Sequence, residues 1–172
     1  MKSTKREGFT LVELLIVIVV IGILSAMMML SSTEAVSSAR ANNIISNLRN
    51  LKTAALAFYV DSLDNLPTGT KYVIPKEYIV KYLGSSNNDE INKNAKTGTG
   101  GDGYSVYITD KKLWIAQYNA TNEKSDVKNK LAARAASVGL KDGNADGKTS
   151  EKDLLVYTKD KNKVCMFVLM GQ

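Results

Sequence analysis

Residues 9–30 form an apolar stretch whose only charged side chain is Glu13. An α-helix needs about 20 apolar residues to cross the hydrocarbon core of a bilayer. No proline interrupts the stretch, so every backbone group can be hydrogen-bonded within one helix, as lipid requires. The sequence therefore predicts a helix that spans a membrane.

The eight residues before this stretch are basic, with Lys2, Lys5 and Arg6 outweighing Glu7. A basic flank stays on the cytoplasmic side, so we expect the bulk of the chain to lie across the membrane. The apolar stretch is longer than the core of a secretory signal, and no convincing small-x-small cleavage site follows it. The helix is therefore expected to be retained as a single-pass anchor in the cytoplasmic membrane, with the N-terminus in the cytoplasm.

Glu13 is unusual, because a carboxylate inside a spanning helix costs about 3 kcal/mol or more and generally indicates function. Residues 8–13 read GFTLVE, between a short basic leader and the apolar helix. This combination resembles the signature of the type IV pilin and pseudopilin superfamily. The resemblance is close over residues 1–30 and extends to the rest of the chain only in architecture.

The resemblance implies that a prepilin peptidase removes the leader, residues 1–8, by cutting after Gly8, and that Phe9 becomes the N-methylated N-terminus. Glu13 then lies four residues from the new ammonium, at a spacing where helical side chains meet. Its charge also suits the positive end of the helix dipole. In a filament, Glu13 of one subunit would neutralise the amine of the next; the sequence does not decide between a pair within one subunit and a pair between two.

The helix is expected to continue through residues 31–60, which lack proline and glycine. Apolar residues recur there at spacings of three and four, which predicts an amphipathic helix with one buried stripe. The stripe consists of Ile44 or Ile45, Leu48, Leu51, Ala55 and Phe58. A continuous helix over residues 9–60 would be about 78 Å long. Many pilins have a kinking proline where this chain has Leu30, so we expect a straighter helix.

Residues 61–172 are predicted to form a globular α+β domain, beginning with a turn at 61–69. Residues 104–109 and 113–118 are aromatic and β-branched runs joined by three polar residues, which is typical of a hairpin. Tyr104, Val106 and Ile108 alternate with more polar residues, so this face should pack on the helix stripe.

Two further strands are expected at residues 154–158 and 164–170, giving about four antiparallel strands in all. Helices are predicted at 75–84 and 123–140, and an exposed loop at 85–103. The predicted fold class is α+β and pilin-like, with a long N-terminal α-helix packed on a small antiparallel β-sheet.

Residues 142–153, DGNADGKTSEKD, fit the twelve-residue pattern of a calcium loop. The proposed ligands are Asp142, Asn144, Asp146, the backbone carbonyl of Lys148, Ser150 through a water, and Asp153. Glycine falls at the sixth position, where the loop must turn. The last position departs from the usual glutamate and resembles the dockerin version of the loop. The alternative is an Asp- and Gly-rich turn with no ion.

The chain has no histidine and one cysteine, which excludes His-based catalysis, His-ligated metal sites and an internal disulfide. It shows no nucleophile elbow, Walker loop or paired-cysteine site, so we do not expect an enzyme. Cys165 is interpreted as a small buried apolar residue. The net charge of +6 is interpreted as a solvated face, and no specific nucleic-acid partner is predicted.

These observations predict a structural subunit of a type IV pilus filament that polymerises through its N-terminal helix. Its partners would be further copies of itself, the peptidase, the pilus assembly platform and motor, and the membrane before assembly. After assembly, the protein would be located in an extracellular pilus. One alternative is a pseudopilin of a type II secretion or DNA-uptake (competence) system, confined to the periplasm or envelope. Another, which Glu13 argues against, is a membrane-tethered calcium-binding domain.

Overall fold

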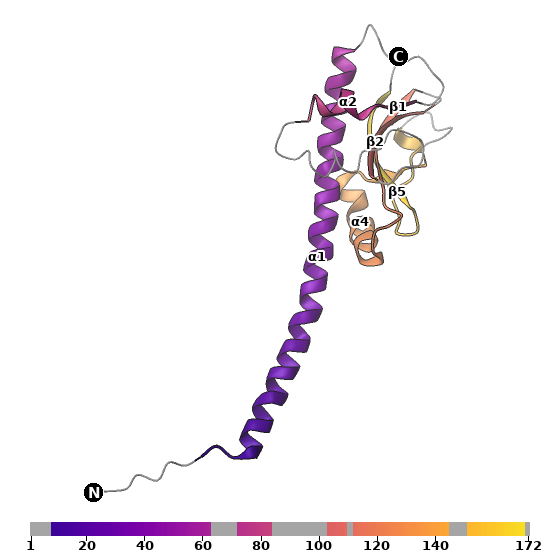
Figure 1. Cartoon of the computed structure of the whole chain (residues 1–172). Coiled ribbons are helices and arrows are strands. Elements are labelled where there is room, and N and C mark those ends of the chain that lie inside the picture. The colour runs from indigo at the N-terminus through magenta and orange to yellow at the C-terminus, as the bar shows by residue number, and fades with distance from the viewer. Residues whose placement is uncertain (1–7, 63–71, 84–102, 110–111, 145–150, 171–172) are drawn as a thin grey trace, which may run out of the picture. The chain divides into compact units, whose positions relative to one another are not determined.

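A computed structural model describes residues 8–62, 72–83, 103–109, 112–144 and 151–170 (Figure 1). The chain divides into two compact units, Met1–Val36 and Ser37–Gln172. We call them the N-terminal unit and the globular unit.

Helix α1, Leu11–Asp61, contributes to both units and confirms the predicted long N-terminal helix. Within the described residues, α1 is the one helix that is long and apolar enough to cross a membrane, and its most apolar window has no buried residue. This agrees with an N-terminal membrane anchor.

In the globular unit, α1 buries the predicted stripe. Ile44, Ile45, Leu48, Leu51, Ala55 and Phe58 are all buried. Asn43 and Arg49, which lie off the stripe, are exposed. The period of the sequence therefore identified the face of α1 that packs on the domain.

The described residues of the globular unit form a five-stranded antiparallel sheet with the order β1-β2-β3-β5-β4. The strands are β1 (Tyr72–Ile74), β2 (Gly103–Ile108), β3 (Leu113–Asn119), β4 (Lys141–Asp142) and β5 (Lys163–Met170). The predicted hairpin is confirmed as β2 and β3. Its turn closes with the Thr109 amide donating to the Leu113 carbonyl at 2.9 Å, and Lys112 adopts a positive φ of 59°.

The strand predicted at residues 154–158 is wrong in extent, because only Val156 bridges, to Lys141. The two-residue strand β4 takes the position beside β5, so residues 155–157 pair only with the outer edge of β4. Neither β1 nor β4 was predicted. Strands of two or three residues carry too little pattern of their own and depend on their neighbours.

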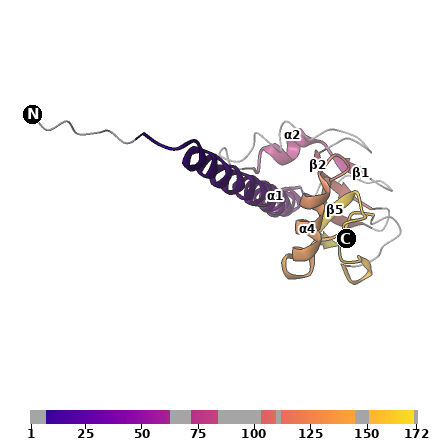
Figure 2. The same ribbon diagram turned by 90° about the horizontal axis from the view of Figure 1, so that it is seen from below.

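Helices α2, Lys76–Val80, and α4, Ser125–Val138, contribute to the same hydrophobic cluster as α1. Figure 2 shows them on opposite sides of α1. Helix α4 ends at Gly139, whose φ of 74° is the left-handed conformation of a glycine C-cap.

Helix α2 is shorter than predicted. Most of the expected loops at 61–69 and 85–103 lie outside the described residues, although Gly103 begins β2.

The sheet is buried on both faces. Tyr104, Val106 and Ile108 join the cluster around α1, as predicted, and Trp114 is also buried there. A second cluster lies on the other face, formed by Tyr107, Leu113, Ile115, Leu154 and Cys165. The prediction that Cys165 is a small buried apolar residue is confirmed, since its exposed fraction is 0%.

Candidate functional site

The bond predicted to be cleaved lies just before α1. Gly8, Phe9 and Thr10 are described but not helical, and α1 begins at Leu11, two residues later than predicted. Phe9 is 92% exposed. A Cβ built on Gly8 would meet nothing within 4 Å. The Gly8–Phe9 bond therefore lies in an exposed segment outside the helix, where a peptidase can reach it.

Thr10 and Glu13 form a capping box at the start of α1. The Thr10 amide donates to Glu13 Oε2 at 2.9 Å, and the Thr10 hydroxyl donates to the same oxygen at 2.8 Å. In return, the Glu13 amide donates to Thr10 Oγ1 at 3.3 Å. The reciprocal bonds satisfy amides that the first helical turn leaves without a partner.

The role of Thr10 was missed by the sequence reasoning, although the Thr-x-x-Glu spacing that signals a capping box was present. The sequence reasoning explained Glu13 only by its charge. In the structure, its carboxylate is also held in place by its own helix terminus. The predicted roles of Gly8, Phe9 and Glu13 in processing and assembly stay predictions.

The proposed calcium loop is described only at its two ends. Asp142 is 8% exposed, and its Oδ2 lies 3.3 Å from Lys161 Nζ. The amide of Asn144 donates to Asp142 Oδ1 at 3.1 Å. Asp153 is exposed at the end of the 3-10 helix η2, Glu151–Asp153. Asp146, Lys148 and Ser150 lie outside the described residues. No cluster of three acidic, cysteine or histidine side chains occurs among the residues that are described.

The base of this loop is closed by backbone bonds to two neighbouring segments. The Asp142 amide donates to the Leu155 carbonyl at 2.8 Å, and the Gly143 amide donates to the Lys163 carbonyl at 2.9 Å. A Cβ on Gly143 would lie 2.7 Å from Lys163 Cβ, so this position needs glycine for close approach.

Burial, together with the nearby Asp142 carboxylate, raises the pKa of the Cys165 thiol to about 12.

A polar cluster connects α1 to Tyr118 in β3 and to Glu123, which precedes α4, and the sequence reasoning also missed it. Arg40 donates to Glu123 Oε1 from Nε at 3.0 Å and from Nη2 at 2.8 Å. The Tyr118 hydroxyl donates to the same oxygen at 2.5 Å. Burial, and then the bond to the Glu123 carboxylate, raise the pKa of Tyr118. The cluster joins residues that are 83 positions apart, in a chain with no disulfide.

Comparison with known proteins bears on the N-terminal segment. Residues 3–29 match the family model described as the prokaryotic N-terminal methylation motif. The match includes Gly8, Phe9, Thr10 and Glu13. No curated protein and no solved structure matches the chain significantly.

Proposed function

We propose that this chain, which carries the prepilin signature of type IV pilins and pseudopilins, is a structural subunit of a type IV pilus filament. The observation that carries the proposal is the methylation motif at the start of a long helix. The first part of that helix exposes its apolar side chains, and the second part packs on a small sheet. The apolar parts of many subunits would bundle in the filament core and replace lipid with one another.

The processing step follows from the motif. The Gly8–Phe9 bond is cleaved by a prepilin peptidase, and the new amine of Phe9 is methylated. The exposure of Phe9 and the open space around Gly8 support access to this bond. Cleavage leaves Thr10 as the second residue, so the new ammonium forms one residue away from the amide that Glu13 already accepts.

Glu13 is proposed to direct assembly through its charge. A carboxylate and an ammonium are each costly in lipid alone and tolerable when paired. The capping box would keep Glu13 oriented along its own helix start until the amine of a neighbouring subunit reaches it. Pairing between subunits would then set how far each subunit is displaced along the filament.

The first test maps the N-terminus of the chain by mass spectrometry, in filaments sheared from cells and in membranes. We expect abundant protein that begins at N-methylated Phe9 in the sheared fraction. The same N-terminus found only in the envelope would instead establish the pseudopilin alternative. Chain with an intact leader in both fractions would contradict the proposal.

Two matched variants separate the charge of Glu13 from its role as a cap. Glu13→Gln retains an oxygen that accepts from Thr10 but removes the charge. Thr10→Val removes the hydroxyl but retains the charge. We expect Glu13→Gln to be absent from filaments while it accumulates in the membrane, and Thr10→Val to assemble. Assembly of both variants at the unsubstituted level would refute the role of the charge.

Calcium binding by residues 142–153 is a second proposal, and it concerns stability. It is supported by the ligand spacing and by the bonds that hold both ends of the loop together. The bond between Asp142 and Lys161 would have to yield to the ion. Exported calcium sites bind with dissociation constants of roughly 10⁻⁴–10⁻³ M. Calcium at ten times that constant would stabilise the fold by about 1.4 kcal/mol.

The calcium proposal is tested on the full chain in detergent by thermal unfolding with calcium and with a chelator. We expect calcium to raise the melting temperature by about 3–6 °C, with no such rise in Asp142→Asn. Lys161→Met removes the competing cation and should increase the affinity for calcium. An unchanged melting curve in chelator would contradict the proposal.

A further inference from the structure

Three consecutive methionines, Met27, Met28 and Met29, lie in the N-terminal unit. They are three of the six methionines in the chain, and their exposed fractions are 66%, 73% and 76%. The apolar residues that precede them from Leu11 to Leu24 are leucine, isoleucine and valine, which are inert to mild oxidants. A thioether sulfur is not inert, since peroxides convert it to a sulfoxide.

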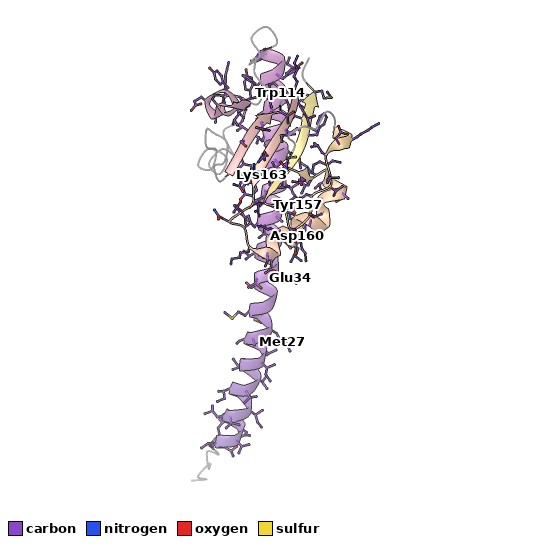
Figure 3. All side chains as sticks on the ribbon, turned by 90° about the vertical axis from the view of Figure 1, so that its right-hand side faces the viewer. Met27, Glu34, Trp114, Tyr157, Asp160 and Lys163 are labelled. Atoms are coloured by element: carbon purple, nitrogen blue, oxygen red, sulfur yellow. The ribbon has the colours of Figure 1, made fainter. Side chains whose placement is uncertain are left out.

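The three side chains surround most of one helical turn. Successive residues of an α-helix are about 100° apart, so three of them cover roughly 200° of its circumference. Figure 3 labels Met27 on α1, in the stretch that carries all three methionines. A neighbouring helix that approaches this turn from more than half of its circumference therefore contacts a thioether.

The depth of these residues follows from chain length, and this step rests on the proposed function. Met28 lies about 26 Å along the helix from Leu11, where α1 begins, and the hydrocarbon core is about 30 Å thick. Polar residues follow from Ser31 onward. In a subunit that waits in the membrane, the three sulfurs therefore lie where the hydrocarbon meets external water.

We propose that Met27, Met28 and Met29 form an oxidation site, which peroxides in the external water modify in the unassembled subunit and which then excludes the subunit from the filament. The sulfur attacks one oxygen of the peroxide, an S–O bond forms and the O–O bond breaks. The leaving hydroxide takes the proton of the transferred oxygen and departs as water, so the sulfur is oxidised and the peroxide is reduced.

The consequence is a change in packing. A flexible apolar side chain becomes a polar and chiral one, on the turn that neighbouring helices must contact. In an assembled filament the same sulfurs are covered by those helices and are protected. Oxidation thus acts before assembly and hardly at all after it.

The chain contains two internal controls in β5. Met166 is 5% exposed and belongs to the hydrophobic core, whereas Met170 is 49% exposed and belongs to the globular unit. Exposure alone predicts that Met170 is oxidised in membranes and in filaments. Protection that depends on assembly is expected only for residues 27–29.

The experiment treats membrane vesicles and sheared filaments with hydrogen peroxide and locates sulfoxides by peptide mass spectrometry. We expect at least about tenfold more sulfoxide at residues 27–29 in the membrane fraction than in filaments. Met166 should resist in both fractions. Equal oxidation of residues 27–29 in the two fractions, or none at a dose that oxidises Met170, would overturn the proposal.

A variant with Met27→Leu, Met28→Leu and Met29→Leu tests the effect on assembly. It should form filaments after peroxide treatment of cells, whereas the unsubstituted chain and Met170→Leu should lose them. Equal loss of filaments by the triple variant would refute the proposal. Absence of filaments without peroxide would count against the proposed function, and the sulfoxide map in membranes would still decide whether the site is oxidised.

Discussion

Replacing Glu123 with alanine should destabilise the globular unit, because it removes one oxygen atom that accepts three hydrogen bonds. Glu123 Oε1 accepts two bonds from Arg40 and one from Tyr118. The substitution leaves a guanidinium and a hydroxyl without this acceptor, and the Arg40 side chain is only 34% exposed. A hydrogen bond to a charged group contributes about 1.5–3 kcal/mol. Because Arg40 can regain water, we expect a net loss of about 2 kcal/mol.

The loss should depend on pH. Burial favours the neutral form of Glu123, but the bonds from Arg40 and Tyr118 outweigh it and lower the pKa of the carboxyl. A lowered pKa in the folded state stabilises the protein above the ordinary glutamate pKa, and this stability is lost as the pH falls through the lowered value. The substitution should therefore cost most near neutral pH and progressively less in acid.

The assay is thermal unfolding of the full chain in detergent, followed by the fluorescence of Trp114, the only tryptophan, which is 2% exposed. About 2 kcal/mol corresponds to a fall in melting temperature of about 4–8 °C. Glu77→Ala, at an exposed position in α2, is the control and should change stability by less than about 0.5 kcal/mol.

A double-mutant cycle isolates the pair. Arg40→Ala, Glu123→Ala and the double variant should show a coupling energy of about 1–2 kcal/mol. A coupling near zero, or an equal loss at pH 3 and pH 7, would refute the reasoning. The cluster would then be a surface ion pair with no part in holding α1 to the domain.

Three further predictions concern single positions. Gly143→Ala should destabilise the chain by about 1–3 kcal/mol in denaturant unfolding, because the added Cβ would lie 2.7 Å from Lys163 Cβ. Gly22→Ala is the control and should not destabilise the chain, because a Cβ at Gly22 meets nothing within 4 Å. Lys112→Gly should raise stability by up to about 1 kcal/mol, because φ is 59° there, and an unchanged denaturation midpoint would contradict this. The buried Cys165, whose pKa is raised to about 12, should resist iodoacetamide at pH 8 in the folded chain and react once it is unfolded; rapid labelling of the folded chain would show that the thiol is accessible.

The long helix and its buried stripe could be predicted from the sequence because both are local periodicities. Ile44, Leu48 and Leu51 recur with the helical period, and their burial follows from it. The hairpin of β2 and β3 was equally local, since its two runs are separated by three turn residues. The N-terminal signature is a contiguous motif, so it was readable without a fold, as was the Thr-x-x-Glu spacing that was overlooked.

Only the tertiary structure decided how the sheet is completed and what fastens α1 to it. The two residues of β4 have no strand pattern of their own. They form a strand because β5 pairs with them on one side and Val156 pairs with Lys141 on the other. Arg40 and Glu123 meet only because the fold brings α1 and the segment that precedes α4 together. Contacts between residues far apart in the chain leave no periodic trace in it, because they gain their free energy only after the chain has closed the loop between them.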